Sequence, residues 1–205
     1  MHEYVNTFVR SIFLENMIFA YFLGICSFLA ISKNVKTAFG LGVAVTFVLI
    51  LAMPICYLLE HYVLRPGALG WLGSAFDTVN ISFLSFILFI AVVAAIVQLI
   101  EMFLEKYMPA LYHTLGIFLP LLAVNCAILG ACLFMQQKHF PSVGIATVYG
   151  LGSGTGWLLA IVGLAAIREK MNWSDVPKPL RGLGIAFIMT ALMGLGFMSF
   201  SGFKF

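Results

Sequence analysis

The feature that most constrains this chain is a series of long apolar runs. A helix needs about 20 apolar residues to cross the hydrocarbon core of a bilayer. Six runs of this kind follow one another, at residues 11–31, 39–59, 80–103, 113–135, 143–167 and 182–203. Hydrophobic residues make up 62% of the chain and charged residues only 9%, which excludes an ordinary water-soluble domain. We predict an all-α integral membrane protein with six transmembrane helices.

The connections between these runs are short and hold most of the charged residues. None is long enough to fold by itself, so residues 1–205 are expected to form a single membrane domain. The first run carries Glu15 and Asn16 and lacks a small-residue cleavage site after its apolar stretch. It is therefore interpreted as a retained helix rather than a signal peptide.

The distribution of Lys and Arg predicts the orientation of the chain, because cytoplasmic loops are enriched in positive charge. The first, third and fifth connections hold Lys33, Lys36, Lys106, Arg168, Lys170, Lys178 and Arg181, whereas the other side holds Arg10, Arg65, Lys138 and Lys204. The odd-numbered connections should then face the cytoplasm, and both termini should lie on the outer side. The net charge of +3 is mostly a topology signal and gives no reason to expect a nucleic-acid partner.

Two fragments suggest an internal repeat. Aligning Cys26 with Cys126 pairs Leu29 with Leu129, and Phe39-Gly40-Leu41-Gly42 resembles Tyr149-Gly150-Leu151-Gly152. Halves at about 1–105 and 106–205 would each hold three spans, so the second would be inverted relative to the first, and functional sites would lie near the midplane between them. Chance recurrence of Gly-Leu-Gly in a Gly-rich chain is the alternative.

The first and fourth runs carry residues that could interrupt a helix. Gly24 precedes Cys26, and Gly116 and Pro120 lead to Asn125 and Cys126. Free backbone groups at membrane depth are tolerated only inside protein or along a cavity, so breaks there would mark a site. A simple kink is the alternative.

The four cysteines divide into two pairs. Cys56 and Cys132 are interpreted as small apolar packing residues. The proposed repeat would bring Cys26 and Cys126 together near the middle of the membrane, as a disulfide, a coincidence or half of a metal site. Thiolates suit copper, zinc and iron-sulfur clusters, and a cluster usually takes four cysteines, so a half site would need a partner.

Other polar residues raise weaker possibilities. Gln98, Glu101 and Glu105 share one helix face, and Glu101 is a candidate sodium-path carboxylate or else a helix-end residue at the interface. For Glu15 and Asn16 we favour interfacial or interhelical hydrogen bonds.

The run from Gly150 to Gly156 has glycines four apart, which indicates close helix packing rather than a dinucleotide loop. The histidines, interpreted as interface residues, are His2, His61, His113 and His139.

Four long motifs carry a family resemblance. They are LGICSFLAISKNVKTAFGLG from Leu23, LGIFLPLLAVNCAILG from Leu115, VYGLGSGTGWLLAI from Val148 and IREKMNWSDVPKPLRGLGIAFI from Ile167. Over essentially the whole chain they resemble the family that contains the E subunit of the bacterial Na+-translocating NADH:quinone oxidoreductase and its sibling, the A subunit of the Rnf complex. The run from Gly150 to Trp157 fits the quinone reductase branch better.

The resemblance implies a six-helix subunit, not catalytic alone, that pairs with a homologous D subunit in the larger complex. It also implies that Cys26 and Cys126 join two partner cysteines around an intramembrane 2Fe-2S iron-sulfur cluster, through which electrons cross the membrane. NADH and quinone would bind to other subunits. Two alternatives stay open: an Rnf-type electron transport subunit, and a cofactor-free secondary transporter on the same inverted-repeat plan.

Overall fold

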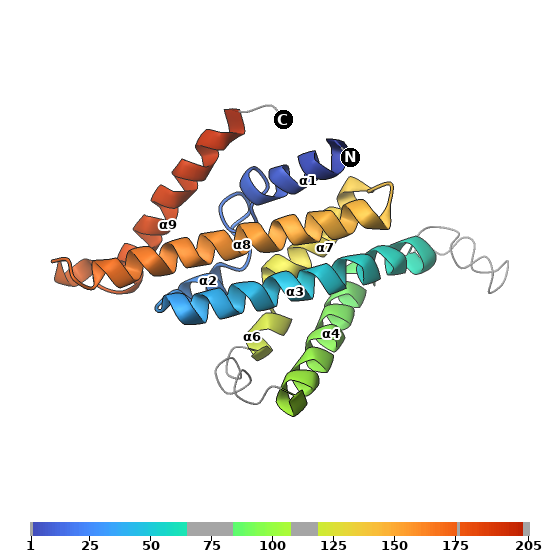
Figure 1. Cartoon of the computed structure of the whole chain (residues 1–205), viewed down its shortest axis with the longest axis horizontal. Helices are drawn as coiled ribbons and strands as arrows, with labels where there is room; N and C mark the ends of the chain where they lie inside the picture. The colour runs from blue at the N-terminus through green and yellow to red at the C-terminus, as the bar shows by residue number, and fades with distance from the viewer. Residues whose placement is uncertain (1, 65–83, 108–118, 176, 203–205) are drawn as a thin grey trace.

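The computed structural model describes residues 2–64, 84–107, 119–175 and 177–202 (Figure 1). Within these ranges every regular element is a helix, as predicted, and no strand is formed. The elements in chain order are α1 (His2–Phe13), α2 (Ile25–Ile31), α3 (Val35–Leu59) with the π-helical turn η1 (Glu60–Leu64), α4 (Ser85–Tyr107), α6 (Leu119–Ala123), α7 (Cys126–Lys138), α8 (Val143–Met171), the 3-10 turn η4 (Lys178–Leu180), α9 (Leu183–Met198) and the 3-10 turn η5 (Ser199–Gly202).

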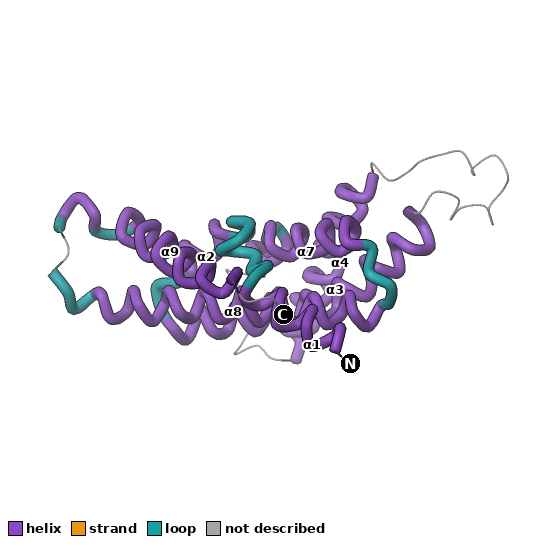
Figure 2. The backbone as a smooth tube through the Cα atoms, turned by 90° about the horizontal axis from the view of Figure 1, so that it is seen from above, coloured by secondary structure: helices purple, strands orange, loops and turns teal. Residues whose placement is uncertain are grey.

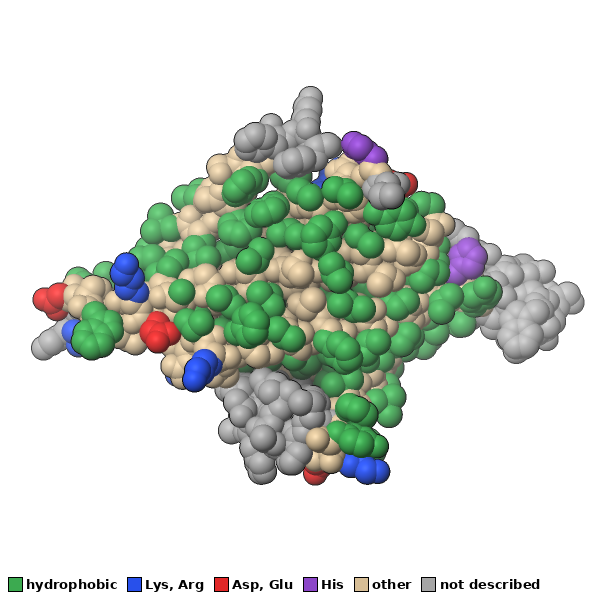
Figure 3. Space-filling model, viewed as in Figure 1, with side chains coloured by type: hydrophobic (Ala, Val, Ile, Leu, Met, Phe, Trp, Pro, Cys, Tyr) green, Lys and Arg blue, Asp and Glu red, His purple; other side chains and the backbone are tan. Residues whose placement is uncertain are grey.

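Four stretches among the described residues are long and apolar enough to span a membrane. They are Val35–Leu64, Ser85–Tyr107, Pro120–Lys138 and Val143–Met171, and α9 is a shorter apolar helix. Figure 3 shows hydrophobic side chains over the middle of one face and charged side chains toward its edges. This distribution agrees with a multi-pass membrane protein. The full count of six spans and the inverted repeat stay predictions.

Helices α3 and α8 form the centre of the structure and run side by side in both views (Figures 1 and 2). A β-carbon on Gly154 of α8 would lie 2.7 Å from the Thr46 Cα of α3, and one on Gly150 would lie 3.0 Å from the Leu49 carbonyl oxygen. Only glycine permits this approach of two backbones. As the α8 residue number rises the α3 number falls, so the two helices are antiparallel.

The alternate glycines of α8 pack against α1. A β-carbon on Gly152 would lie 3.0 Å from the Phe8 carbonyl oxygen, and one on Gly156 would lie 2.9 Å from the Ile12 carbonyl oxygen. The two pairs of glycines four residues apart therefore serve two different helix contacts. The helix-packing interpretation of this glycine run is confirmed.

The first predicted span is interrupted. Helix α1 ends at Phe13, α2 begins at Ile25, and residues 14–24 between them form turns in which Phe22 and Gly24 have positive φ angles. The buried Asn16 side chain holds this turn region: its Nδ2 donates to the Ile12 and Gly156 carbonyl oxygens, and its Oδ1 accepts from Ile18 N. The bonds to Ile12 and Ile18 satisfy backbone groups at the break, and the bond to Gly156 ties the turn region to α8.

The fourth predicted span is interrupted as well. Helix α6 ends at Ala123, Val124 and Asn125 are non-helical, and α7 begins at Cys126. Gly116 lies outside the described residues, and Pro120 is the second residue of α6, where a missing backbone N–H costs no hydrogen bond. The prediction of breaks in both spans is confirmed, and in the fourth span the break lies at Asn125 rather than at the proline.

Candidate metal centre at two broken helices

The two breaks touch each other. A β-carbon on Gly24 would lie 2.7 Å from the Asn125 Oδ1 and 3.0 Å from the Ala127 Cβ. The first break also contacts α7 itself, because Leu23 packs on Gly130. The segments are about one hundred residues apart in sequence, so tertiary packing joins the two interruptions at one place.

Cys26 and Cys126 follow these breaks directly. Cys26 is the second residue of α2, and Cys126 is the first residue of α7. Both are free thiols with exposed side chains, whereas Cys56 and Cys132 are buried. The two cysteines that the sequence analysis paired thus lie in the first turns of two helices whose preceding turns are in contact.

Local hydrogen bonds fix the start of each helix. The Asn125 Oδ1 accepts from Ala127 N at 3.0 Å and caps α7, and the Ser27 hydroxyl donates to the Gly24 carbonyl oxygen at 2.9 Å. Gly24 has a φ of 76°, a left-handed conformation that side chains disfavour. These features set the direction in which α2 and α7 leave the breaks, and with it the positions of both thiols.

Two buried N–H donors at the break have no partner among the described residues. The Asn125 Nδ2 and the Trp157 Nε1 make no hydrogen bond there, although Asn125 is 4% exposed and Trp157 is fully buried. A β-carbon on Gly24 would lie 3.0 Å from the Trp157 Nε1, so both donors belong to the junction of the two breaks. Unpaired buried donors are costly, so each one calls for an explanation, such as an ion or another acceptor that is absent from the chain itself.

The donor set fits half of a thiolate-ligated metal centre. Two thiols are soft ligands, and their exposure leaves room for ligands from a second protein. Within the described ranges, no three His, Cys, Asp or Glu side chains are grouped closely enough to hold a metal ion.

Cys56 and Cys132 are far less accessible. Both are fully buried, and the Cys132 thiol interacts with that of Cys56. The interpretation of these two residues as packing residues agrees with this burial.

Glu15 lies two residues after the end of α1 and pairs with two cations. Its carboxylate accepts from the Arg10 Nε at 2.9 Å and from the Lys138 Nζ of α7. Together with the Asn16 bond to Gly156, this confirms the expected interhelical role of these two polar residues.

Glu101 and the histidines are not brought to the two breaks. Glu101 is half-buried near the end of α4. His2 and His61 are exposed, His139 ends α7 and lies 3.8 Å from a Glu60 carboxylate oxygen, and His113 falls outside the described residues.

Comparison with known proteins identifies the family. The family described as "Rnf-Nqr subunit, membrane protein" matches residues 4–204. The chain is 60% identical over 204 residues to a protein of Klebsiella pneumoniae subsp. pneumoniae, with 98% of each chain covered. It is 57% identical over 202 residues to one of Idiomarina loihiensis, again with 98% of each covered, and 57% identical over 204 residues to one of Psychromonas ingrahamii, with 100% of each covered. All three are named as the E subunit of Na(+)-translocating NADH-quinone reductase, an oxidoreductase complex. This chain belongs to the Rnf-Nqr family of membrane subunits.

Proposed function

We propose that this chain is the E subunit of a Na+-translocating NADH:quinone oxidoreductase, acting within the complex and not alone. The names of relatives at 57–60% identity over nearly the full chain support this function. In this proposal the chain crosses a bacterial inner membrane six times as two inverted three-helix repeats, with both termini in the periplasm. The antiparallel contact between α3 and α8, the middle spans of the two halves, is the arrangement that such a repeat requires.

The proposed role is to hold half of an intramembrane 2Fe-2S cluster through Cys26 and Cys126. The observation that supports it is the contact between the two helix breaks, each of which is followed within one helical turn by a cysteine with an exposed thiol. A homologous D subunit would supply the other two thiolates, since such a cluster takes four. The cluster, when bound, supplies one-electron transfer between redox centres on opposite sides of the membrane.

The chain's own residues prepare this half site. Asn125 caps the helix that begins at Cys126, and Gly24 permits the turn that leads to Cys26. The unpaired N–H groups of Asn125 and Trp157 lie at the same junction, where donors to sulfur would tune the reduction potential.

Elemental analysis of the purified complex tests this role. Iron and acid-labile sulfide are measured in the wild type, in Cys26→Ala and Cys126→Ala, and in the control Cys132→Ala. We expect each of the first two variants to lose one cluster's worth of iron and the control to lose none. Unchanged iron in Cys26→Ala and Cys126→Ala would remove the metal site and favour the cofactor-free transporter. An intact cluster in a complex that oxidises ferredoxin would instead indicate an Rnf-type subunit.

Glu101 is proposed as a carboxylate of the sodium path, on the basis of its place near the end of a mostly exposed apolar helix. Glu101→Gln should weaken the sodium dependence of turnover, whereas the neighbouring Glu105→Gln, on an exposed side chain, should leave it unchanged. Equal sodium dependence in the wild type and Glu101→Gln would remove this residue from the path.

A further inference from the structure

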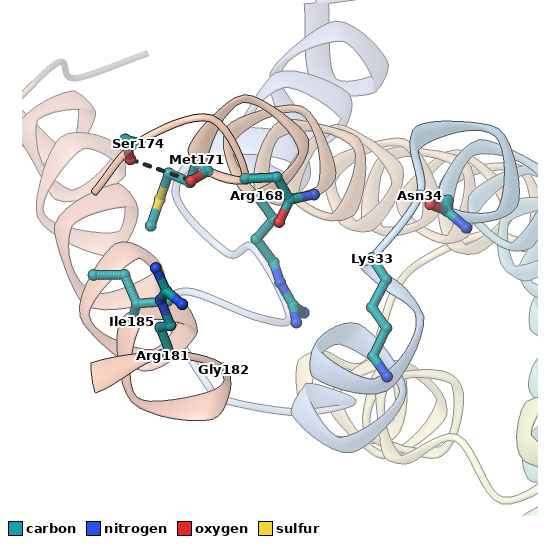
Figure 4. Close-up of a pocket in the computed structure, with 9 residues that line it drawn as sticks. Lys33, Asn34, Arg168, Met171, Ser174, Arg181, Gly182 and Ile185 are labelled. Carbon is teal, nitrogen blue, oxygen red and sulfur yellow. Dashed lines mark hydrogen bonds between the residues drawn. The ribbon is translucent and has the colours of Figure 1, made fainter. Parts of the chain in front are cut away.

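A polar cavity lies where the end of α8 meets the start of α9 and the connection between α2 and α3. Its volume is about 660 Å³, and its lining includes Lys33, Asn34, Arg168, Ser174, Arg181 and Gly182. Figure 4 shows the Lys33, Arg168 and Arg181 side chains around the cavity, with Arg168 between the other two in this view. No acidic side chain of the described residues is among those that line it. Three cations around one hollow make it a site for an anion.

Arg168 is held in place rather than extended into solvent. Its Nη1 donates to the Leu29 carbonyl oxygen at 2.9 Å and to the Ser32 hydroxyl at 2.7 Å. These bonds occupy one guanidinium nitrogen and tie α8 to the end of α2. An anion entering the cavity would therefore meet a preorganised guanidinium, which reduces the entropy that binding must overcome.

The start of α9 adds further positive potential. Gly182 lines the cavity, has a φ of 96°, and provides no side-chain cap for this 16-residue helix. A β-carbon on Gly182 would meet nothing within 4 Å, so the helix N-terminus faces open space on this side. Uncapped N–H groups and the helix dipole favour an anion at this position.

A second hollow adjoins the first and is mostly apolar. It has a volume of about 540 Å³ and shares Lys33, Arg168 and Gly182 with the polar cavity. Its other lining residues are Cys26, Leu29, Ala30 and Leu183. A cationic pocket continued by an apolar groove matches a ligand with an anionic head and an aliphatic chain.

We propose that this paired hollow binds an anionic phospholipid, with the phosphate among Lys33, Arg168 and Arg181 and an acyl chain along Leu29 and Leu183. Basic pockets between membrane helices bind anionic headgroups in this way. A free phosphate shares the headgroup chemistry, but the adjoining apolar groove favours the lipid. The cationic cavity that would hold the headgroup contains neither Cys26 nor Cys126, whereas Cys26 lines the adjoining apolar hollow. The anion-binding part of the inference therefore does not depend on the metal centre.

The test uses the purified complex in nanodiscs of phosphatidylcholine with a graded fraction of phosphatidylglycerol. Native mass spectrometry counts the phosphatidylglycerol molecules that remain bound to the wild type, to Lys33→Gln/Arg181→Gln and to the matched control Lys36→Gln/Lys170→Gln. Both control lysines are exposed and neither lines the cavity. Arg168 is left unchanged because its bonds to Leu29 and Ser32 hold the fold.

We expect the first double variant to lose one bound phosphatidylglycerol and the control to lose none. Each removed cation should weaken binding about fivefold. The proposal would be overturned if the two double variants lost equal numbers of phosphatidylglycerol molecules. It would also be overturned if the wild type retained phosphatidylcholine as well as it retains phosphatidylglycerol. Displacement of phosphatidylglycerol by inorganic phosphate alone would overturn the lipid assignment in favour of a free anion.

A double variant that disturbs assembly of the complex is recognised by its size-exclusion profile, and the single variant Lys33→Gln then replaces it. Because one cation is removed, Lys33→Gln should bind phosphatidylglycerol about fivefold more weakly than the wild type. Iron content, measured on the same samples, should stay at the wild-type value in all of these variants. Loss of lipid with unchanged iron would separate this site from the proposed metal centre.

Discussion

Gly24 lies so close to Asn125 that a β-carbon added to Gly24 would come within 2.7 Å of the Asn125 Oδ1. The same oxygen caps α7 by accepting from Ala127 N. The Asn125 Oδ1 therefore contacts the first break at Gly24 and also caps α7, the helix that follows the second break. The positions of Cys26 and Cys126 are coupled through this contact, because each follows one of the two residues within the same turn.

Gly24→Ala should destabilise the protein by about 2–4 kcal/mol, because the left-handed φ of 76° disfavours any side chain and the new methyl group would overlap Asn125 and Ala127. We expect a lower midpoint of thermal unfolding for the purified complex, together with a loss of iron if the two cysteines are cluster ligands.

Gly196→Ala is the matched control for this substitution. A β-carbon on Gly196 in α9 would meet nothing within 4 Å, so alanine should be neutral or stabilise the helix by up to about 1 kcal/mol. A Gly24→Ala protein that unfolds at the wild-type temperature would show that the contact between the breaks contributes little.

Glycine, proline and asparagine in the first and fourth apolar runs indicated where the helices could be interrupted. They did not indicate how many residues each interruption would include. The first run is continuously apolar around Glu15 and Asn16, yet residues 14–24 are non-helical because Asn16 satisfies backbone groups of α1, the turn region and α8 at once. A partner such as Gly156 cannot be inferred from a single run. Proline was also a weak guide: Pro54 lies inside α3 without ending it, and Pro120 is the second residue of α6, which continues past it.

The candidate site could be predicted in part. Aligning Cys26 with Cys126 paired Leu29 with Leu129 and suggested that the two cysteines are equivalent, and the glycine spacing in α8 indicated its close packing. The cationic cavity was missed, because the sequence shows Lys33, Arg168 and Arg181 as topology signals in two different connections. Only the packing of α9 beside α2 and α8 turns these charges into one pocket.

Gly154→Ala should separate α3 from α8 and cost about 1–3 kcal/mol, because overpacking a close contact forces the backbone apart. The new methyl group would lie 2.7 Å from the Thr46 Cα, and a backbone atom cannot move without displacing its helix. The control is Gly163→Ala on the same helix, where the nearest atom, at 2.9 Å, is the flexible end of Met193. We expect reduced thermal stability for the first variant only; equal stability of the two would contradict the packing argument.

The ion pairs of Glu15 should differ in strength. The Lys138 and Glu15 side chains are 31% and 12% exposed, whereas Arg10 is 61% exposed and more strongly screened by water. A double-mutant cycle of Glu15→Gln with Lys138→Gln should give a coupling energy of about 1–2 kcal/mol, and the cycle with Arg10→Gln less than about 0.5 kcal/mol. Chemical unfolding in mixed micelles measures both; a larger coupling to Arg10 would contradict the burial argument.

Substitutions of Asn125 separate its role as a helix cap from its role as an N–H donor. Asn125→Ala removes the oxygen that accepts from Ala127 N and should cost about 1 kcal/mol, with fraying of the turn that carries Cys126. Asn125→Ser keeps a capping oxygen but removes the buried, unpaired Nδ2, so it should restore most of the stability.

If the Nδ2 donates to a cluster sulfur, Asn125→Ser should retain iron and shift the cluster's reduction potential to a more negative value, because a hydrogen bond to sulfur stabilises the reduced form. A spectroscopic redox titration measures this shift. If Asn125→Ser has the wild-type reduction potential and full stability, Asn125 acts only as a helix cap and not as a donor to sulfur. If the Ala and Ser variants are equally stable, the capping role is contradicted as well.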